Sequence, residues 1–368
     1  MEHPENAPAP SSGEGEFTPQ GVIIKNTDPD RLNMPPYRDA CFYQKRKHGA
    51  FRAVEAPVFA RPVADTHAHL RMFDDPAFEL ARCAVLGVGF ICLMNDPCEA
   101  GTEVFENLAT WQADAARFAA ELQETLTQTD AAADVSQGDA PSSHDAEATL
   151  LPDVRIAVGV HPHNAHFYDD VTENLLKQLL ADPRVSALGE IGLDYHYDFS
   201  TREEQQFAFR RQLQIAREAG LPVILHVREA YDEVLEILHE EGFPTTETLL
   251  HCCSLDEEGL RPWIDAGSYI AYGGSLTFKK ADDVRAAVPL VPRDRLLTET
   301  DSPYMTPEPM RGVACTPAHV LFNVQKLCEA LGCESDEERS VLLEQLMANA
   351  RALLDRPPTA WQQERASR

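Results

Sequence analysis

The run VADTHAHLRMF, residues 63–73, places two histidines one residue apart, His67 and His69. In a β-strand, residues i and i+2 point to the same face, so the two imidazoles would converge on one point. Imidazole nitrogens are common ligands of divalent metals. Taken alone, this pattern is more typical of a loop in which both histidines face the solvent. The positions of other candidate ligands along the chain therefore decide between the two interpretations.

Further candidate ligands follow several short apolar runs of the kind expected for buried strands. They are His161 and His163 in GVHPHNA, Glu190 in LGEIGLDYH, His226 in VILHVR, His251 in LLHCC and Asp301 in LLTETDSP. Any one of them has a structural explanation, since a lone histidine at a strand end is commonly a hydrogen-bonded structural residue. Together they indicate one site, because burying so many imidazoles and carboxylates is costly unless a metal compensates them.

These residue types predict a particular chemistry. Histidines together with carboxylates suit one or two divalent ions such as Zn²⁺, Mn²⁺, Co²⁺ or Ni²⁺, whereas Mg²⁺ prefers more oxygen ligands. Glu190 is the central candidate for a carboxylate shared by two ions. A bound metal would lower the pKa of a water molecule and supply a hydroxide nucleophile. Asp301 would then accept or relay the proton, and the set predicts a hydrolase.

The elements that must position these residues are visible in the alternation of apolar runs with helical patterns from residue 63 onward. Near-continuous apolar strands separated by helices predict a parallel sheet covered on both faces. Residues 200–222 illustrate the helical pattern, with a capping box of Thr201 and Glu204 and a stop at Gly220. We predict an α/β fold, a (β/α)8 TIM barrel with the ligands at the carboxyl ends of its strands. An open doubly wound sheet is the alternative, but no glycine-rich phosphate loop follows the first strand.

The remaining segments lie around and within this domain. Residues 1–60 are predicted to be an N-terminal extension whose first 20 residues, rich in Pro, Ser, Gly and Glu, are disordered. The barrel domain is predicted over residues 61–356. An insert at about residues 112–150 interrupts it, with a helical first half and an acidic, mobile second half. Residues 357–368 are a predicted C-terminal tail.

Composition narrows the possible partners and the location. The net charge of −28 over 368 residues argues against a broad basic surface for nucleic acids, although bound metal ions would supply positive charge locally. No apolar run is long enough for a membrane span, and the first residues lack the features of a secretory signal. The nine scattered cysteines are then expected to be reduced thiols. We predict a cytoplasmic protein with no membrane contact and no obligate protein partner.

Seven motifs over about residues 62–355 resemble, in order, those of the TatD-like metal-dependent hydrolases of the amidohydrolase superfamily: DTHAHL, GVHPHNA, GEIGLDYH, LHVREAYDEVLEIL, HCCS, YGGSLTFK and ETDSPYMTP. The resemblance implies a TIM barrel with one or two metal ions (Zn, Mg or Mn). It also implies a hydrolase acting on ester bonds, a deoxyribonuclease that cleaves DNA or RNA ends, often from 3′ to 5′.

The resemblance also assigns residues. It implies a first metal held by His67, His69, Glu190 and Asp301, and a second held by Glu190, His226 and His251. Glu190 and Asp301 are then the catalytic carboxylates. Five other motif positions are implied near the substrate: His163, Asp194, His196, Arg228 and Tyr304. From the residues alone, Asp194 and Arg228 are equally compatible with a structural ion pair.

Two stretches depart from the family pattern and leave the substrate open. HCCSLD carries Cys253 and Leu255, and RGVACTP carries Val313, Cys315 and Thr316 where the family has Lys, Asn and Glu. Three functions follow: cleavage of nucleic-acid ends, hydrolysis of a small amide, ester or lactone, and binding without turnover. The complete ligand set argues against the last.

Overall fold

The computed structural model describes residues 41–46, 50–134 and 150–366. The predicted disorder of residues 1–20, and most of the acidic second half of the insert, lie outside the described residues. Within the described part of the chain, no helix combines the length and apolar character needed to cross a membrane.

Eight parallel strands form the centre of the fold and pair in chain order: β3 (Val63–Ala68), β4 (Val88–Asn95), β5 (Asp153–Val158), β6 (Val185–Asp194), β7 (Val223–Arg228), β8 (Thr248–Leu250), β9 (Tyr269–Tyr272) and β10 (Leu296–Thr298). The first and last strands meet through a parallel bridge between Ala68 and Ser302. Thr66 Oγ1 also donates to the Thr298 carbonyl at 3.0 Å. The predicted TIM barrel is therefore confirmed.

The barrel interior is a packed core. One buried apolar cluster takes residues from all eight strands, including Ala64, Phe90, Ile224 and Leu297. Alternate side chains of each strand point inward, so small and large residues fill the interior together. Leu353 of α10 (Asp336–Leu354) extends this cluster at the amino ends of the strands.

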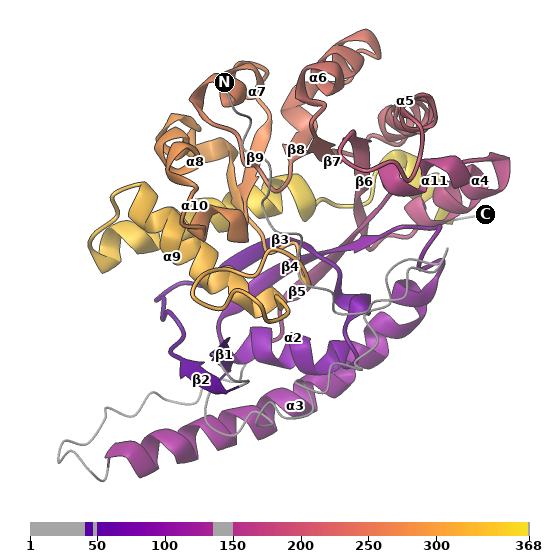
Figure 1. Cartoon of the computed structure of the whole chain (residues 1–368). Helices are drawn as coiled ribbons and strands as arrows, with labels where there is room; N and C mark the ends of the chain where they lie inside the picture. The colour runs from indigo at the N-terminus through magenta and orange to yellow at the C-terminus, as the bar shows by residue number, and fades with distance from the viewer. Residues whose placement is uncertain (1–40, 47–49, 135–149, 367–368) are drawn as a thin grey trace.

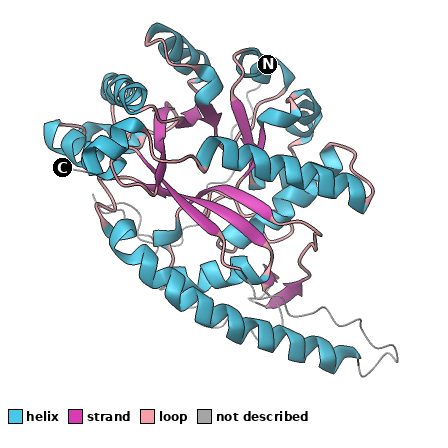
Figure 2. Cartoon of the chain, turned by 180° about the vertical axis from the view of Figure 1, so that it is seen from behind, coloured by secondary structure: helices cyan, strands magenta, loops and turns pink. Residues whose placement is uncertain are grey.

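Helices surround the strands, as Figures 1 and 2 show. Besides α10, they are α2 (Pro76–Val85), α3 (Glu103–Asp134), α4 (Asp170–Leu180), α5 (Arg202–Ala219), α6 (Tyr231–Glu240), α7 (Glu257–Asp265), α8 (Asp282–Ala287), α9 (Val320–Ala330) and α11 (Ala360–Ala366). The predicted capping box is present in α5: Thr201 Oγ1 accepts from the Glu204 amide, and the Glu204 carboxylate accepts from the Thr201 amide. Gly220 ends this helix with φ 66°, a conformation that favours glycine.

The segments outside the barrel pack onto it. A hairpin of β1 (Phe42–Lys45) and β2 (Phe51–Val54) places the Phe42 ring 4.9 Å from that of Phe322 on α9. The predicted helical half of the insert is not a separate element, because α3 begins before the insert and continues into it, beside α2 (Figure 1). In the tail, Gln362 of α11 donates to the carbonyls of Leu180 and Val185.

Candidate metal centre

The six residues predicted to bind metal converge at the carboxyl ends of the strands. His67 lies in β3, Glu190 in β6 and His226 in β7. The other three follow strands directly or within three residues: His69 after β3, His251 after β8 and Asp301 after β10. Because parallel strands of a barrel end at the same rim, side chains far apart in the sequence become neighbours there. The structure thus brings all six together, and their binding of metal stays a prediction.

Glu190 lies between two pairs of histidines. Its Oε2 is 3.3 Å from His67 Nε2 and 3.9 Å from His69 Nε2. Its Oε1 is 2.7 Å from His251 Nε2 and 2.8 Å from His226 Nδ1. The two carboxylate oxygens therefore face different ligand pairs. This arrangement is compatible with a carboxylate that would be shared by two cations.

Asp301 completes the first pair of histidines. Its Oδ1 is 3.5 Å from His69 Nε2 and 3.8 Å from His67 Nε2. The Asp301 backbone has φ 58°, in the left-handed region, and its amide donates to the His67 carbonyl at 2.9 Å. A non-glycine residue in this region is uncommon and is found at functional sites. The turn after β10 therefore fixes Asp301 directly beside β3.

The electrostatics of the centre favour ionised carboxylates. Burial alone would raise the pKa of Glu190, but the imidazoles of His251 and His67 lower it to well below its usual value. Burial likewise opposes ionisation of Asp301, yet its hydrogen bond with His69 and the nearby imidazoles lower the pKa of that carboxyl. Conversely, burial would lower the pKa of His251, whereas Glu190 and Glu299 raise it well above normal.

The donor set fits a divalent metal. The ligand atoms of His67, His69 and Glu190 lie within 4.8 Å of one another, and so do those of Glu190, His226 and His251. Imidazole nitrogens and carboxylate oxygens are the donors that Zn²⁺ and related ions take. One or two divalent cations would also balance the ionised carboxylates of this buried cluster.

Sequence reasoning assigned no role to two buried acids next to the ligands. Asp65 accepts from the Thr300 hydroxyl at 2.7 Å and the Thr300 amide at 2.9 Å, which ties β3 to the turn after β10. Glu299 Oε1 lies 3.6 Å from His251 Nδ1 and accepts from the Cys252 amide. Carboxylates behind ligand histidines commonly orient them. The available signal was their place inside the motifs ADTH and TETD.

His161 is a further histidine of the centre that the ligand assignment left out. Its Nε2 is 3.8 Å from Glu190 Oε1, and its ring centroid lies 4.4 Å from that of His226. Burial and the neighbouring His226 lower its pKa to well below the usual value, which favours the neutral ring. A neutral imidazole is the form that binds a metal.

Comparison with known proteins identifies the family. The family described as TatD related DNase matches residues 64–355. The chain belongs to the TatD-related DNase family. The resemblance found in the motifs is therefore confirmed.

Individual TatD-type relatives agree with this assignment. The uncharacterized metal-dependent hydrolase YabD of Bacillus subtilis strain 168 is 38% identical over 190 residues, which are 51% of this chain and 74% of that protein. The 3′-5′ ssDNA/RNA exonuclease TatD of Erwinia billingiae strain Eb661 is 36% identical over 201 residues, 54% of this chain and 77% of that protein. The crystal structure of YJJV, a TatD homolog from Escherichia coli K12, aligns with a TM-score of 0.59 at 26% identity. That alignment covers 80% of this chain and 98% of that chain. The predicted class, a metal-dependent hydrolase, is confirmed.

The predicted substrate residues of this TatD-type chain divide into a buried one and four at the rim. Asp194 is buried, and its Oδ2 accepts from His163 Nε2 at 2.9 Å and from His226 Nε2 at 3.0 Å. Burial would raise the pKa of Asp194, but these two histidines lower it far below normal. Asp194 thus links a rim histidine to a predicted ligand. Its contact with substrate stays a prediction.

The rim residues are more open. His196 Nδ1 lies 2.7 Å from Glu229 Oε1, and both side chains are exposed. The Arg228 guanidinium lies 4.9 Å from the ring centroid of Tyr197. Tyr304 is exposed, and its ring centroid is 6.2 Å from that of His69. All three predicted residues therefore border the TatD-type centre from the solvent side.

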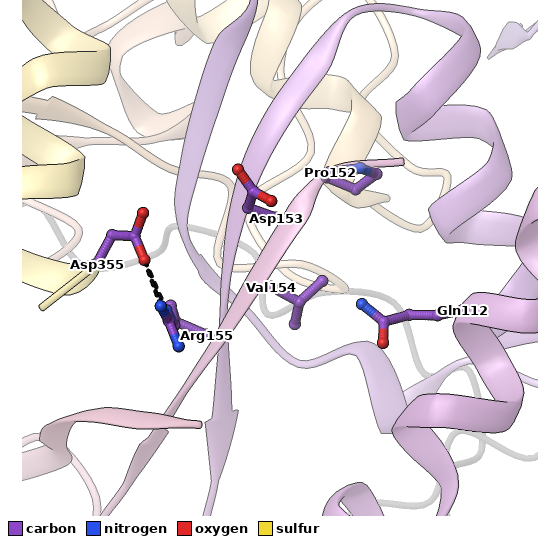
Figure 3. A pocket seen from close by; sticks show the side chains of 6 residues that line it. All are labelled: Gln112, Pro152, Asp153, Val154, Arg155 and Asp355. Atoms are coloured by element: carbon purple, nitrogen blue, oxygen red, sulfur yellow. Dashed lines mark hydrogen bonds and ion pairs between the residues drawn. The ribbon is translucent and has the colours of Figure 1, made fainter. Parts of the chain in front are cut away.

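A hollow, shown in Figure 3, lies beside Asp153 at the start of β5, and so at the amino end of the barrel. Its lining comes from α3, from the start of β5 with the residue before it, and from the residue after α10: Gln112, Pro152, Asp153, Val154, Arg155 and Asp355. Arg155 Nη2 and Asp355 Oδ1 form an ion pair of 2.7 Å, so these charges satisfy each other. The histidine cluster of this TatD-type fold lies at the other end.

Proposed function

We propose that this chain is a metal-dependent deoxyribonuclease and exonuclease that hydrolyses phosphodiester bonds at the ends of DNA, and of RNA as a further substrate. The observation that carries the proposal is Glu190, whose two oxygens face two separate histidine pairs. The name of the Erwinia relative, 3′-5′ ssDNA/RNA exonuclease TatD, supports the choice of substrate.

The metal would be held by the predicted sets, one of His67, His69, Glu190 and Asp301 and one of Glu190, His226 and His251. When bound, a divalent cation supplies Lewis acidity toward the phosphate and lowers the pKa of water; Zn²⁺, Mg²⁺ and Mn²⁺ are the proposed ions.

The chain's own groups supply proton transfer and positioning. The side chain of Asp301 is 16% exposed and that of Glu190 is 7% exposed, so Asp301 is the more open of the two catalytic carboxylates. Because its pKa is lowered, Asp301 is ionised near neutral pH and accepts the proton of the attacking water. Arg228 at the rim positions a non-bridging phosphate oxygen through charge-assisted hydrogen bonds. His163, held by Asp194, orients the substrate beside it.

The test is a time course on 5′-labelled single-stranded DNA and RNA with Mg²⁺, Mn²⁺ or Zn²⁺, with Asp301→Asn as the inactive control. We expect a ladder that shortens from the 3′ end with the wild type and no cleavage with the variant. Intact DNA and RNA after incubation with metal-loaded wild-type protein would contradict the proposal. Turnover of small amides, esters or lactones by that same preparation would then identify the other predicted substrate class.

A further inference from the structure

Exposed tyrosines stand on opposite sides of the centre. Tyr197 follows β6 and is 41% exposed, and Tyr304 follows β10 and is 43% exposed. In the order of the eight strands, β6 is the fourth strand from β10 in either direction around the closed barrel. The two tyrosines therefore lie on opposite sides of the barrel rim. Glu190 lies between the histidine pairs, with His67 and His69 near one carboxylate oxygen and His226 and His251 near the other.

Tyr197 is tied to the buried part of the centre. Its backbone amide donates to Asp194 Oδ1 at 3.3 Å, and Asp194 Oδ2 accepts from His163 and His226. The ring centroid of Tyr197 lies 5.4 Å from that of His163. The segment after β6 is therefore anchored by the same carboxylate that holds a predicted ligand, which fixes the place of Tyr197 relative to His226.

Arg228 adds a cation to this side. Its guanidinium lies 4.9 Å from the Tyr197 ring centroid, and in the described part of the chain it takes part in no ion pair. By contrast, Arg71 on the opposite side of the rim is bound to Glu99 at 2.7 Å. In a chain with a net charge of −28, an arginine without a carboxylate partner beside an exposed ring is a local site for an anion next to an aromatic group.

A nucleotide has both of these groups. Proteins that bind single strands combine a cation for the backbone with aromatic side chains on which bases stack. We propose that Tyr197 stacks on a nucleobase on one side of the scissile phosphate while Tyr304 contacts the base on the other side. Arg228 then meets the phosphate of the nucleotide on Tyr197. Such stacking needs unpaired bases.

This inference rests on the proposed nuclease function and adds to it the recognition of the bases. The test is steady-state kinetics of the metal-loaded enzyme on two 5′-labelled single-stranded oligonucleotides of equal length. One carries normal bases, and the other has tetrahydrofuran abasic residues on both sides of the 3′-terminal phosphodiester. The variants are Tyr197→Ala, Tyr197→Phe and, as a matched exposed aromatic on α5, Phe207→Ala.

We expect Tyr197→Ala to raise KM about tenfold on the normal strand, with kcat and the abasic strand little changed. Tyr197→Phe keeps the ring and should behave as the wild type, and so should Phe207→Ala. The inference is overturned if Tyr197→Ala cleaves the normal strand like the wild type. It is also overturned if the variant's KM rises by the same factor on the normal and the abasic strand. A wild type that cleaves neither strand instead refutes the nuclease function itself. Thermal unfolding of each variant separates these results from misfolding.

Discussion

The two ends of the barrel use charged residues in opposite ways. At the amino end, charges meet in ion pairs: Arg155 with Asp355 at 2.7 Å (Figure 3) and Arg351 with Asp153 at 2.6 Å. At the carboxyl end, one carboxylate, Glu190, lies within 4 Å of five imidazoles, those of His67, His69, His161, His226 and His251. Paired charges stabilise a fold, whereas converging donors create a place for an external cation. In this barrel, the ion pairs that stabilise the fold thus lie at the amino end, and the predicted metal ligands lie at the carboxyl end.

The largest expected effect is the loss of Glu190. Glu190→Gln removes the charge shared by both histidine pairs, and we expect hydrolysis to fall by more than about 100-fold, since even partners behind the ligands contribute 10- to 100-fold. Glu247→Gln is the matched control, because Glu247 pairs with Arg356 just before β8 at the amino end. The checks are kcat on the labelled oligonucleotide and the metal content of each protein. Equal rates of hydrolysis for both variants would contradict the prediction that the catalytic site lies at the carboxyl ends of the strands.

Removal of the metal tests, through the free energy of unfolding, whether the carboxyl end of the barrel binds a cation. A metal present at about 100 times its dissociation constant should raise the free energy of unfolding by about 2.7 kcal/mol. Thermal unfolding with metal and with a chelator measures this difference. The Glu190→Gln variant should show little of it, because its centre has lost the shared ligand. An equal shift in both proteins would place metal binding elsewhere.

Substitution of Asp194 tests whether this residue supports the predicted ligand His226 or contacts the substrate. In Asp194→Asn the side chain keeps its shape but loses the charge that holds His226 and His163, and we expect metal affinity to fall about 10- to 100-fold. Metal titration monitored by calorimetry gives the affinity, and kinetics at saturating metal give KM. A raised KM with unchanged metal affinity would instead assign Asp194 to the substrate.

Arg155 should give the smallest effect, and only on stability. Arg155→Ala removes one partner of a partly exposed pair, so we expect a loss of about 1 kcal/mol in urea unfolding and no change in kcat. Burial would raise the pKa of Asp355, but Arg155 and Arg351 lower it overall. A carboxyl with a lowered pKa stabilises the fold above its unfolded pKa of about 3.9, and the contribution is lost as pH falls through the folded value. The free energy of unfolding of the variant should therefore fall less than that of the wild type on acidification. A drop in kcat would contradict the prediction that the amino end of the barrel takes no part in catalysis.

Much of the fold could be read from local patterns. The apolar runs gave the eight strands because a strand covered on both faces must be apolar along most of its length, as β6 is. The Thr201 capping box marked the start of α5 because its hydrogen bonds are local to four residues. The start of α3 at Glu103 was missed, since no boundary in the sequence separates the insert from the helix that leads into it.

The sequence by itself determined the ligand types, their order along the chain and the rim of the barrel at which they collect. These follow from strand periodicity and from the shared direction of parallel strands. Only the tertiary structure decided that Glu190 divides its two oxygens between histidine pairs, that Asp194 lies behind His226, and that Tyr197 and Tyr304 follow strands on opposite sides of the barrel. Such relations depend on the closure of the barrel, which joins residues from 32 to more than a hundred positions apart and leaves no trace in local sequence.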